Sequence, residues 1–179
     1  VFVEGDGVTL AGLRFGANTP SNGQTIAVTG DAFTLVNCDI AVAGGGSVRF
    51  DDLRFDATNA VSYIQQYTLT GNLFGLGAHL DLTNGAGYSG PASGRVIQNN
   101  VFDLAGGSGP AIGFTGMVAG APGLTYAVGG AVIQNNQFQN AASQYIRAQG
   151  SYDNTQFDWA AYWNANVYDR ATIGGANPP

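Results

Sequence analysis

The chain has 179 residues, of which 28 are glycine and only 10% are charged. Its six cationic residues are all arginine, and with 12 acidic residues they leave a formal net charge of −6. This composition excludes the basic surface with which proteins bind nucleic-acid phosphates, and no apolar run approaches the length of a membrane span. We therefore expect no nucleic-acid partner and no membrane insertion.

The composition favours strands over helices. Lysine is absent and Glu4 is the only glutamate, so two of the main helix-forming residues are nearly missing. Glycine, asparagine, threonine, valine and phenylalanine are abundant, which is typical of strands and tight turns. We therefore predict an all-β protein.

An eight-residue module recurs along the chain at unequal intervals. Its third and eighth positions are large and apolar throughout, so both are predicted to point into a core. A constant module with variable spacing is typical of stacked coils that carry loops of different length. The modules span residues 8–15, 33–40, 48–55, 67–74, 95–102, 131–138 and 161–168. The step between the second and third modules is the shortest.

The fifth position of the module predicts a one-residue bend. Glycine, asparagine and aspartate tolerate a left-handed backbone, and one of them occupies this position in every module but the last. The residues are Gly12, Asn37, Asp52, Gly71, Asn99, Asn135 and Ala165.

The sixth position predicts an internal asparagine ladder. Leu13, Cys38 and Leu53 begin the column, and Asn72, Asn100, Asn136 and Asn166 continue it. Stacked amides one strand spacing apart, about 4.8 Å, can donate and accept along the column. Their bonds would satisfy groups that each cost about 1–3 kcal/mol when buried without a partner. An ordinary polar turn is the alternative interpretation.

The seventh position is predicted to face solvent. Arg14, Asp39 and Arg54 would then lie on adjacent coils with alternating charge. We expect a surface ion ladder that helps to set the register of the strands. The alternative is that the arginines clamp a substrate.

A second strand is expected before most modules. The candidates are residues 2–4, 25–29, 61–65, 78–82, 111–115 and 145–148. Glycine-rich stretches separate them from the modules, and long loops in solenoids often lie on one face.

The module patterns V-T-L-x-G-L-x-F, L-x-N-C-x-I and I-x-N-N-x-F resemble the right-handed parallel β-helix of the pectin-lyase-like superfamily. The resemblance implies a single-stranded solenoid of about six to seven coils with long glycine-rich loops. We expect residues 1–170 to form this domain and residues 171–179 to form a tail or linker. The superfamily includes polysaccharide lyases, hydrolases, epimerases, phage tailspikes and surface adhesins, so the resemblance implies little about activity.

The densest charge cluster consists of Asp51, Asp52, Asp56, Arg49 and Arg54. Three carboxylates so close together could bind Ca²⁺ or supply a glycosidase acid and base. Polysaccharide lyases of the resembling fold typically combine Ca²⁺-binding acids with an arginine or lysine base. The alternative is structural, because Asp52 occupies the bend column and Asp51 an outward position. Beyond Ca²⁺, no cofactor is expected.

His79, the only histidine, is the second candidate for chemistry. Asp81 lies two residues further along, on the same face of the predicted strand, and a His–Asp pair can act as a general base. The alternative is a solvated pair without a catalytic role. Cys38, the only cysteine, is expected to be an inert core thiol.

Aromatic residues concentrate near the C-terminal end. Trp163 and Tyr168 fall in inward columns and are expected to plug the end of the solenoid. Tyr152, Trp159 and Tyr162 are candidates for stacking on sugar rings, with a capping role as the alternative. The N-terminal end shows no comparable cap, so we expect further coils of a longer chain or a neighbouring subunit to cover it.

Three functions remain open at this level. We expect a structural or adhesive module of an extracellular or cell-surface bacterial protein, with a polysaccharide or surface glycan as its candidate ligand. The second hypothesis is a polysaccharide-active enzyme, a lyase or a glycoside hydrolase. The third is a segment of a phage fibre or tailspike.

Overall fold

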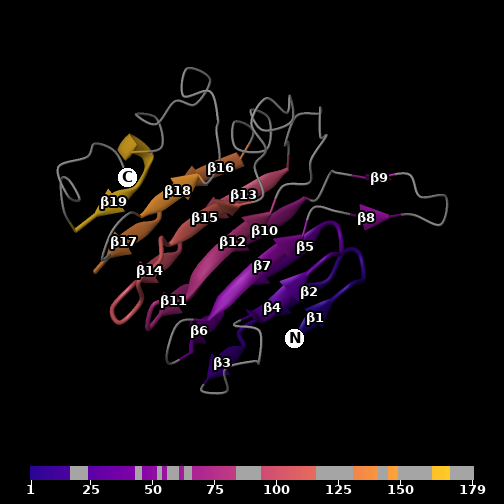
Figure 1. Cartoon of the computed structure of the whole chain (residues 1–179), viewed down its shortest axis with the longest axis horizontal. Helices are drawn as coiled ribbons and strands as arrows, with labels where there is room; N and C mark the ends of the chain where they lie inside the picture. Colours follow the sequence, from indigo (N-terminus) through magenta and orange to yellow (C-terminus); the bar gives the residue numbers. More distant parts are fainter. Residues whose placement is uncertain are drawn as a thin grey trace.

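The computed structural model describes residues 1–16, 24–42, 46–51, 54–55, 61–62, 66–83, 94–115, 131–140, 145–148 and 163–169. In this part of the chain the protein is all-β, with three parallel sheets and a single helical turn at residues 163–165. Figure 1 shows the strands stacked in sequence order from the N-terminal end to the C-terminal end.

Sheet A contains the strands that precede most of the modules. Its order is β1-β4-β7-β12-β15-β18, and every neighbouring pair is parallel. The strands are β1 (Phe2–Val3), β4 (Gln24–Val28), β7 (Ser47–Asp51), β12 (His79–Thr83), β15 (Ile112–Thr115) and β18 (Ile146–Ala148).

Sheets B and C contain the two halves of the module. Sheet B consists of β2 (Thr9–Ala11), β5 (Phe33–Val36), β10 (Tyr67–Thr70), β13 (Arg95–Gln98) and β16 (Ala131–Gln134). Sheet C consists of β3 (Arg14–Gly16), β6 (Asp39–Ala41), β11 (Leu73–Gly75), β14 (Val101–Asp103), β17 (Gln137–Gln139) and β19 (Val167–Tyr168). Apart from residues 54–55 and 61–62, and a last round that has no strand in sheet B, the described strands go through sheets A, B and C in turn, and each such round is called a pass below. This order is compatible with a parallel β-helix.

The bend between sheets B and C occurs at the predicted position. Gly12, Asn37, Gly71, Asn99 and Asn135 all have a positive φ, between 52° and 68°. Each lies between a strand of sheet B and a strand of sheet C. Glycine and asparagine are needed here because other residues pay a steric cost in the left-handed region. The prediction for these five residues is confirmed.

The apolar columns form the core. Leu35, Leu69 and Ile97 from the third column are fully buried, and Ile133 is nearly so. In the eighth column, Phe74, Phe102 and Phe138 are fully buried and stack on one another, with ring centroids 4.6 Å and 5.0 Å apart. Tyr168 continues the stack on Phe138 at 5.1 Å.

The asparagine side chains form a hydrogen-bonded row beside the bend. Nδ2 of Asn72, Asn100 and Asn136 donates to Oδ1 of the next asparagine in the row, at 2.9–3.0 Å. Each Nδ2 also donates to a backbone carbonyl of the sheet B strand one pass earlier. Asn100, which follows β13, donates in this way to Leu69 of β10. Cys38 begins the row, because its backbone N–H donates to Oδ1 of Asn72 at 2.9 Å.

The predicted third module is wrong. Residues 48–51 belong to β7 of sheet A, where β7 pairs with β4 and β12, so Phe50 is not in the third column of sheet B. Arg54 and Phe55 form β8, which pairs antiparallel with β9 (Val61–Ser62) outside the three large sheets. Tyr67–Thr70 therefore pairs directly with Phe33–Val36. Alternation alone does not distinguish strands of sheet A from strands of sheet B, which explains the error.

Two related expectations change with this module. In the seventh column, Arg14 pairs with Asp39 at 3.3 Å, but the next residue in register is Leu73 and not Arg54. The strand expected at 61–65 also fails to join sheet A. Asp52 and Leu53 lie outside the described residues.

Leu13 is not buried as expected, since 44% of its surface is exposed. It precedes β3, the last strand of sheet C at the N-terminal end, so no further strand covers it. Cys38, one step inside the stack in the same column, is 2% exposed, as expected for a core thiol. Its Sγ lies 3.4 Å from the carbonyl oxygen of Val36.

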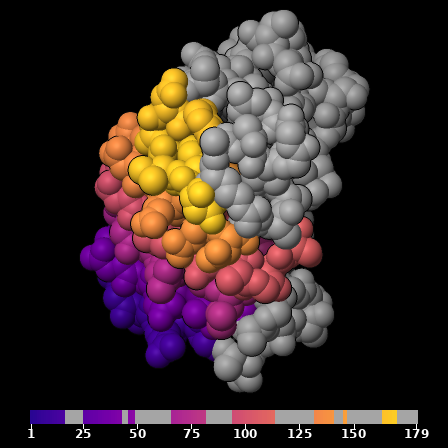
Figure 2. All heavy atoms as spheres, turned by 90° about the vertical axis from the view of Figure 1, so that its left-hand side faces the viewer, coloured from indigo at the N-terminus to yellow at the C-terminus, as the bar shows by residue number. Residues whose placement is uncertain are grey.

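At the C-terminal end, Trp163 lies in the helical turn and not in a strand of sheet B. Its ring stacks on Tyr168 with centroids 4.0 Å apart and an angle of 7° between the rings. Figure 2 shows the described residues in bands of sequence colour from indigo at one end to yellow at the other. Residues 170–179, including the expected tail, lie outside the described part.

Candidate functional site

The candidate site lies on strand β12, on the side of sheet A that faces away from the core. Ala78 and Leu80 are fully buried, whereas His79 and Asp81 alternate with them and are partly exposed. The exposed fractions of the two side chains are 27% and 31%. The alternation of the sequence A-H-L-D therefore places the imidazole and the carboxylate side by side on the outer surface.

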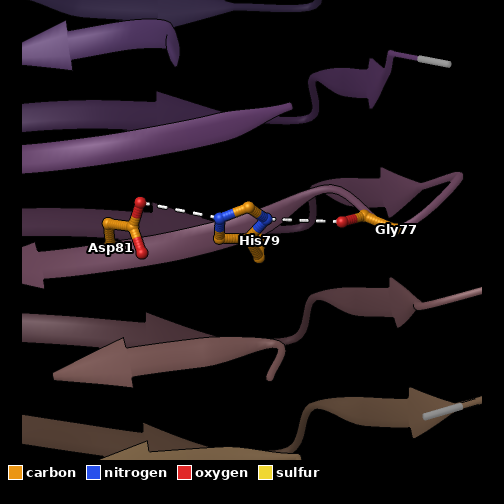
Figure 3. Close-up of polar contacts among 3 residues, drawn as sticks. All are labelled: Gly77, His79 and Asp81. Carbon is orange, nitrogen blue, oxygen red and sulfur yellow. Dashed lines mark hydrogen bonds and ion pairs between the residues drawn. The ribbon is translucent and has the colours of Figure 1, made fainter. Parts of the chain in front are cut away.

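His79 contacts an acceptor through each ring nitrogen. Nε2 lies 3.5 Å from Oδ2 of Asp81, and Nδ1 lies 3.4 Å from the carbonyl oxygen of Gly77. Figure 3 shows the ring between these two oxygens. A protonated imidazolium donates at both nitrogens, so this arrangement favours the charged form.

The pKa of His79 is raised above its usual 6.5. The hydrogen bond with Asp81 is the largest cause, partial burial opposes it, and attraction to the Asp81 charge and the Gly77 carbonyl add to the rise. The arrangement therefore holds the proton on the His79 imidazole more firmly than water does, and the Asp81 carboxylate can accept hydrogen bonds from hydroxyl groups of a ligand.

The register of sheet A brings together two groups of residues that are remote in sequence. Arg49 of β7 is the in-register partner of Asp81, and Asp51 is the partner of Thr83. Register partners in a parallel sheet occupy the same face. We call the positions Arg49, Asp51, His79 and Asp81 the outer strip of sheet A.

Gly113 and Arg147 extend the outer strip and were not among the predicted site residues. Gly113 is the partner of Asp81 on β15, and Arg147 is the partner of Gly113 on β18. A Cβ on Gly113 would lie 3.6 Å from Oδ1 of Asp81 and 3.6 Å from Cγ of Pro110, so position 113 borders both side chains. A sequence signal could have identified Gly113 and Arg147. The strands expected at 78–82, 111–115 and 145–148 would have to be aligned as direct neighbours in one sheet.

Several predicted site residues are not placed. Asp52 and Asp56 lie outside the described residues, as do the candidate sugar-stacking residues Tyr152, Trp159 and Tyr162. Within the described part, no three His, Cys, Asp or Glu residues are grouped as metal ligands would be. The Ca²⁺ expectation involves Asp51, whose backbone lies in β7, together with Asp52 and Asp56 beyond the described part, and it stays a prediction. Among the described residues, no helix is long and apolar enough to cross a membrane.

Arg95 is a buried cation that the sequence patterns did not single out. It lies at an inward position of β13 and is 3% exposed. Its guanidinium carbon is 5.7 Å from the centre of the Tyr67 ring on the neighbouring strand, within the range of a cation–π contact. Burial assigns Arg95 to the scaffold and not to the outer strip.

Comparison of the chain with models of known protein families, with curated proteins and with solved structures finds no match.

Proposed function

We propose that the chain is a right-handed parallel β-helix of the pectin-lyase-like type, with about six coils. It acts as a structural and adhesive module of an extracellular or cell-surface bacterial protein, and its ligand is a glycan. The observation that carries the proposal is the regular interior, in which stacked phenylalanine rings and hydrogen-bonded asparagine amides connect one pass with the next. The polar pair of His79 and Asp81 lies on the outer face of the same stack.

The distribution of long connections supports a binding role. Three long stretches of the chain lead from sheet A to sheet B, residues 52–66, 84–94 and 116–130, and residues 149–162 lead from sheet A to the helical turn at 163–165. The equivalent stretches in the first two passes are residues 4–8 and 29–32. The long stretches therefore attach along one edge of sheet A, next to the outer strip, as binding loops attach to a rigid scaffold.

The chemistry of the outer strip suits a hydroxyl-rich ligand. The strip contains the Asp81 carboxylate and the His79 imidazole, which together offer an acceptor and a donor to sugar hydroxyls. The low charge of the whole chain favours a ligand recognised by hydrogen bonds and ring stacking.

Binding can be tested by titrating pectate, alginate, hyaluronan and neutral glycans into the protein and measuring heat. We expect binding of at least one glycan, weakened at least tenfold by Asp81→Ala. Gln137→Ala, an exposed change on sheet C, is the matched control and should bind normally. Failure of all glycans, or equal binding by both variants, would remove the outer strip as a glycan site.

A polysaccharide-active enzyme is the second candidate, favoured by the His79–Asp81 pair with Arg49 in register. In this case His79 would act as the acid or base, with Asp81 orienting it. Incubation with the same polymers should then release unsaturated products or new reducing ends. Asp81→Asn should reduce this turnover without loss of fold, and the absence of any product would exclude the candidate for those polymers.

A further inference from the structure

The connection from sheet C to sheet A is shortest where it leads into the candidate site. Residues 76–78 join β11 to β12, whereas residues 42–46 make this connection in the pass before and residues 104–111 in the pass after. The short connection ends at His79, the first residue of β12. Its Gly77 carbonyl oxygen lies 3.4 Å from Nδ1 of His79, as Figure 3 shows. The connection is therefore continuous with the outer strip of sheet A.

Residues 75–78 form a tight turn with two left-handed residues. The backbone N–H of Ala78 donates to the carbonyl oxygen of Gly75 at 3.1 Å. Between them, Leu76 and Gly77 have φ values of +57° and +81°. Positive φ at both central residues is the pattern of a type I′ turn, whose first central position is normally asparagine, aspartate or glycine. Leucine occupies that position here.

The second central position of the turn has a clear reason for its residue. A Cβ on Gly77 would lie 2.6 Å from Cα of Gly107 in the next pass, so a side chain does not fit between the two backbones. Leu76 has no such reason in the turn itself, because a left-handed backbone places its Cβ at a steric disadvantage. The choice of leucine therefore opposes the local backbone.

Burial does not compensate for this strain. Val42 and Leu104 hold the same place, two residues after the buried residue of their strand in sheet C, and each is 1% exposed. Leu76, in contrast, is 49% exposed. One exposed leucine is ordinary in a protein surface, but here exposure and backbone strain coincide. Strain of this kind is concentrated at sites that contact ligands, which gives the leucine a reason to be there.

Leu76 and Asp81 lie along one line of the chain, at opposite ends of the candidate site. The Cα atoms of Leu76 and His79 are at most about 11 Å apart, and Asp81 lies about 7 Å further along the extended strand. A glycan that contacts both residues therefore spans more than one sugar unit and runs along β12. Its hydroxyl groups face Asp81, and an apolar part of it faces Leu76.

We propose that Leu76 is a ligand-contacting residue that extends the glycan site past His79 to the turn at 75–78. This inference rests on the glycan-binding function proposed above. The ligand is a neutral polysaccharide that carries acetyl groups, whose methyl groups pack on Leu76 while sugar hydroxyls bind Asp81. A neutral polymer suits the site because the chain has a net charge of −6 and repels polyanions. An acetyl group supplies apolar surface that a hydroxyl group lacks.

Calorimetric titration with acetylated xylan, and with the same polymer after alkaline deacetylation, tests the inference. The wild-type protein should bind the acetylated form about tenfold more tightly, as expected for burial of part of a leucine side chain. Leu76→Asn should lose this preference, and Leu76→Met should keep it. Leu73→Asn is the matched control, because Leu73 is 42% exposed on the outer face of sheet C and lies outside the site.

Thermal unfolding of the same variants separates binding from folding. Leu76→Asn suits the left-handed turn and should be at least as stable as the wild type, so its weaker binding cannot arise from loss of the fold. If Leu76→Asn binds the acetylated polymer as tightly as Leu73→Asn does, the inference is wrong. Equal affinity of the wild type for the two forms of the polymer would also overturn it.

The result for Asp81→Ala distinguishes failure of this inference from failure of the proposed function. Weaker glycan binding by Asp81→Ala, together with normal binding by Leu76→Asn, would leave the glycan site in place and exclude only its extension to Leu76. If the wild type binds none of the glycans, the proposed function fails and this inference fails with it.

Discussion

Asn100 donates a hydrogen bond from Nδ2 to Oδ1 of Asn136 at 3.0 Å, although 36 residues separate them in the sequence. Both side chains are buried, with 1% and 0% of their surface exposed. The contact ties two consecutive passes of the chain together at the bend, and the predictions below begin from it.

Asn100→Ala should lower the free energy of unfolding by roughly 1–3 kcal/mol. The change removes the acceptor for the backbone N–H of Asn72 and the donor to the carbonyl of Leu69, and both groups are buried. Chemical denaturation measures the loss. Gln137→Ala is the control and should stay within about 0.5 kcal/mol of wild type. An unchanged denaturation midpoint for Asn100→Ala would show that the amide does not stabilise the stack.

Phe102→Ala should cost about 3–5 kcal/mol, because it leaves a cavity in the middle of the ring stack. Phe102 is fully buried between Phe74 and Phe138. Phe102→Leu keeps more of the volume and should cost less. Thermal and chemical unfolding of both variants provide the measurement, and equal losses would argue against a stack in which volume matters.

Leu76→Asn should stabilise the protein by up to about 1 kcal/mol. Leu76 has a φ of +57° and is 49% exposed, so it carries the left-handed strain of about 1–2 kcal/mol with little burial in return. Asparagine tolerates this region, as Asn37, Asn99 and Asn135 do here. Leu73→Asn, in a strand, is the matched control and should not stabilise. A lower melting temperature for Leu76→Asn would mean that the leucine makes a contact worth more than its strain.

Asn135→Val should destabilise by about 1–2 kcal/mol, whereas Asn135→Gly should be tolerated. Asn135 is exposed and has a φ of +55°, so the cost arises from the backbone and not from lost packing. The difference between the two variants in urea denaturation isolates this effect. Similar stability of both would contradict the bend as the reason for asparagine at this position.

His79 should titrate with a pKa above 6.5, and Asp81→Asn should lower that pKa. As the only histidine, it gives a single set of ring signals in an NMR titration. Because its folded pKa is raised, the stability that it contributes is fully present below pH 6.5 and is lost as pH rises through the folded pKa. Melting temperatures across this window should therefore fall with pH in wild type and less in Asp81→Asn. A pKa at or below 6.5 in the wild type would contradict the pairing.

Much of the candidate site could be predicted from local alternation. His79 and Asp81 are two residues apart in a strand, and that spacing alone places them on one face. Their neighbours cannot be predicted in the same way, because the eight-residue pattern places Arg49 in the repeated module, whereas the structure places it in a strand beside β12. Gly113 and Arg147 were missed for the same reason, since register across a sheet depends on which strands are adjacent.

The sequence by itself determined the columns, because left-handed bends, inward rings and inward amides are each restricted to a few residue types. It therefore predicted Asn99 at a bend and Phe102 in the core, and both lie there. Only the tertiary structure decided that β7 joins sheet A, that Arg49 lies beside Asp81, and that Leu13 is exposed at an end. These facts depend on pairing between distant strands, and the same alternating pattern fits any sheet of the stack.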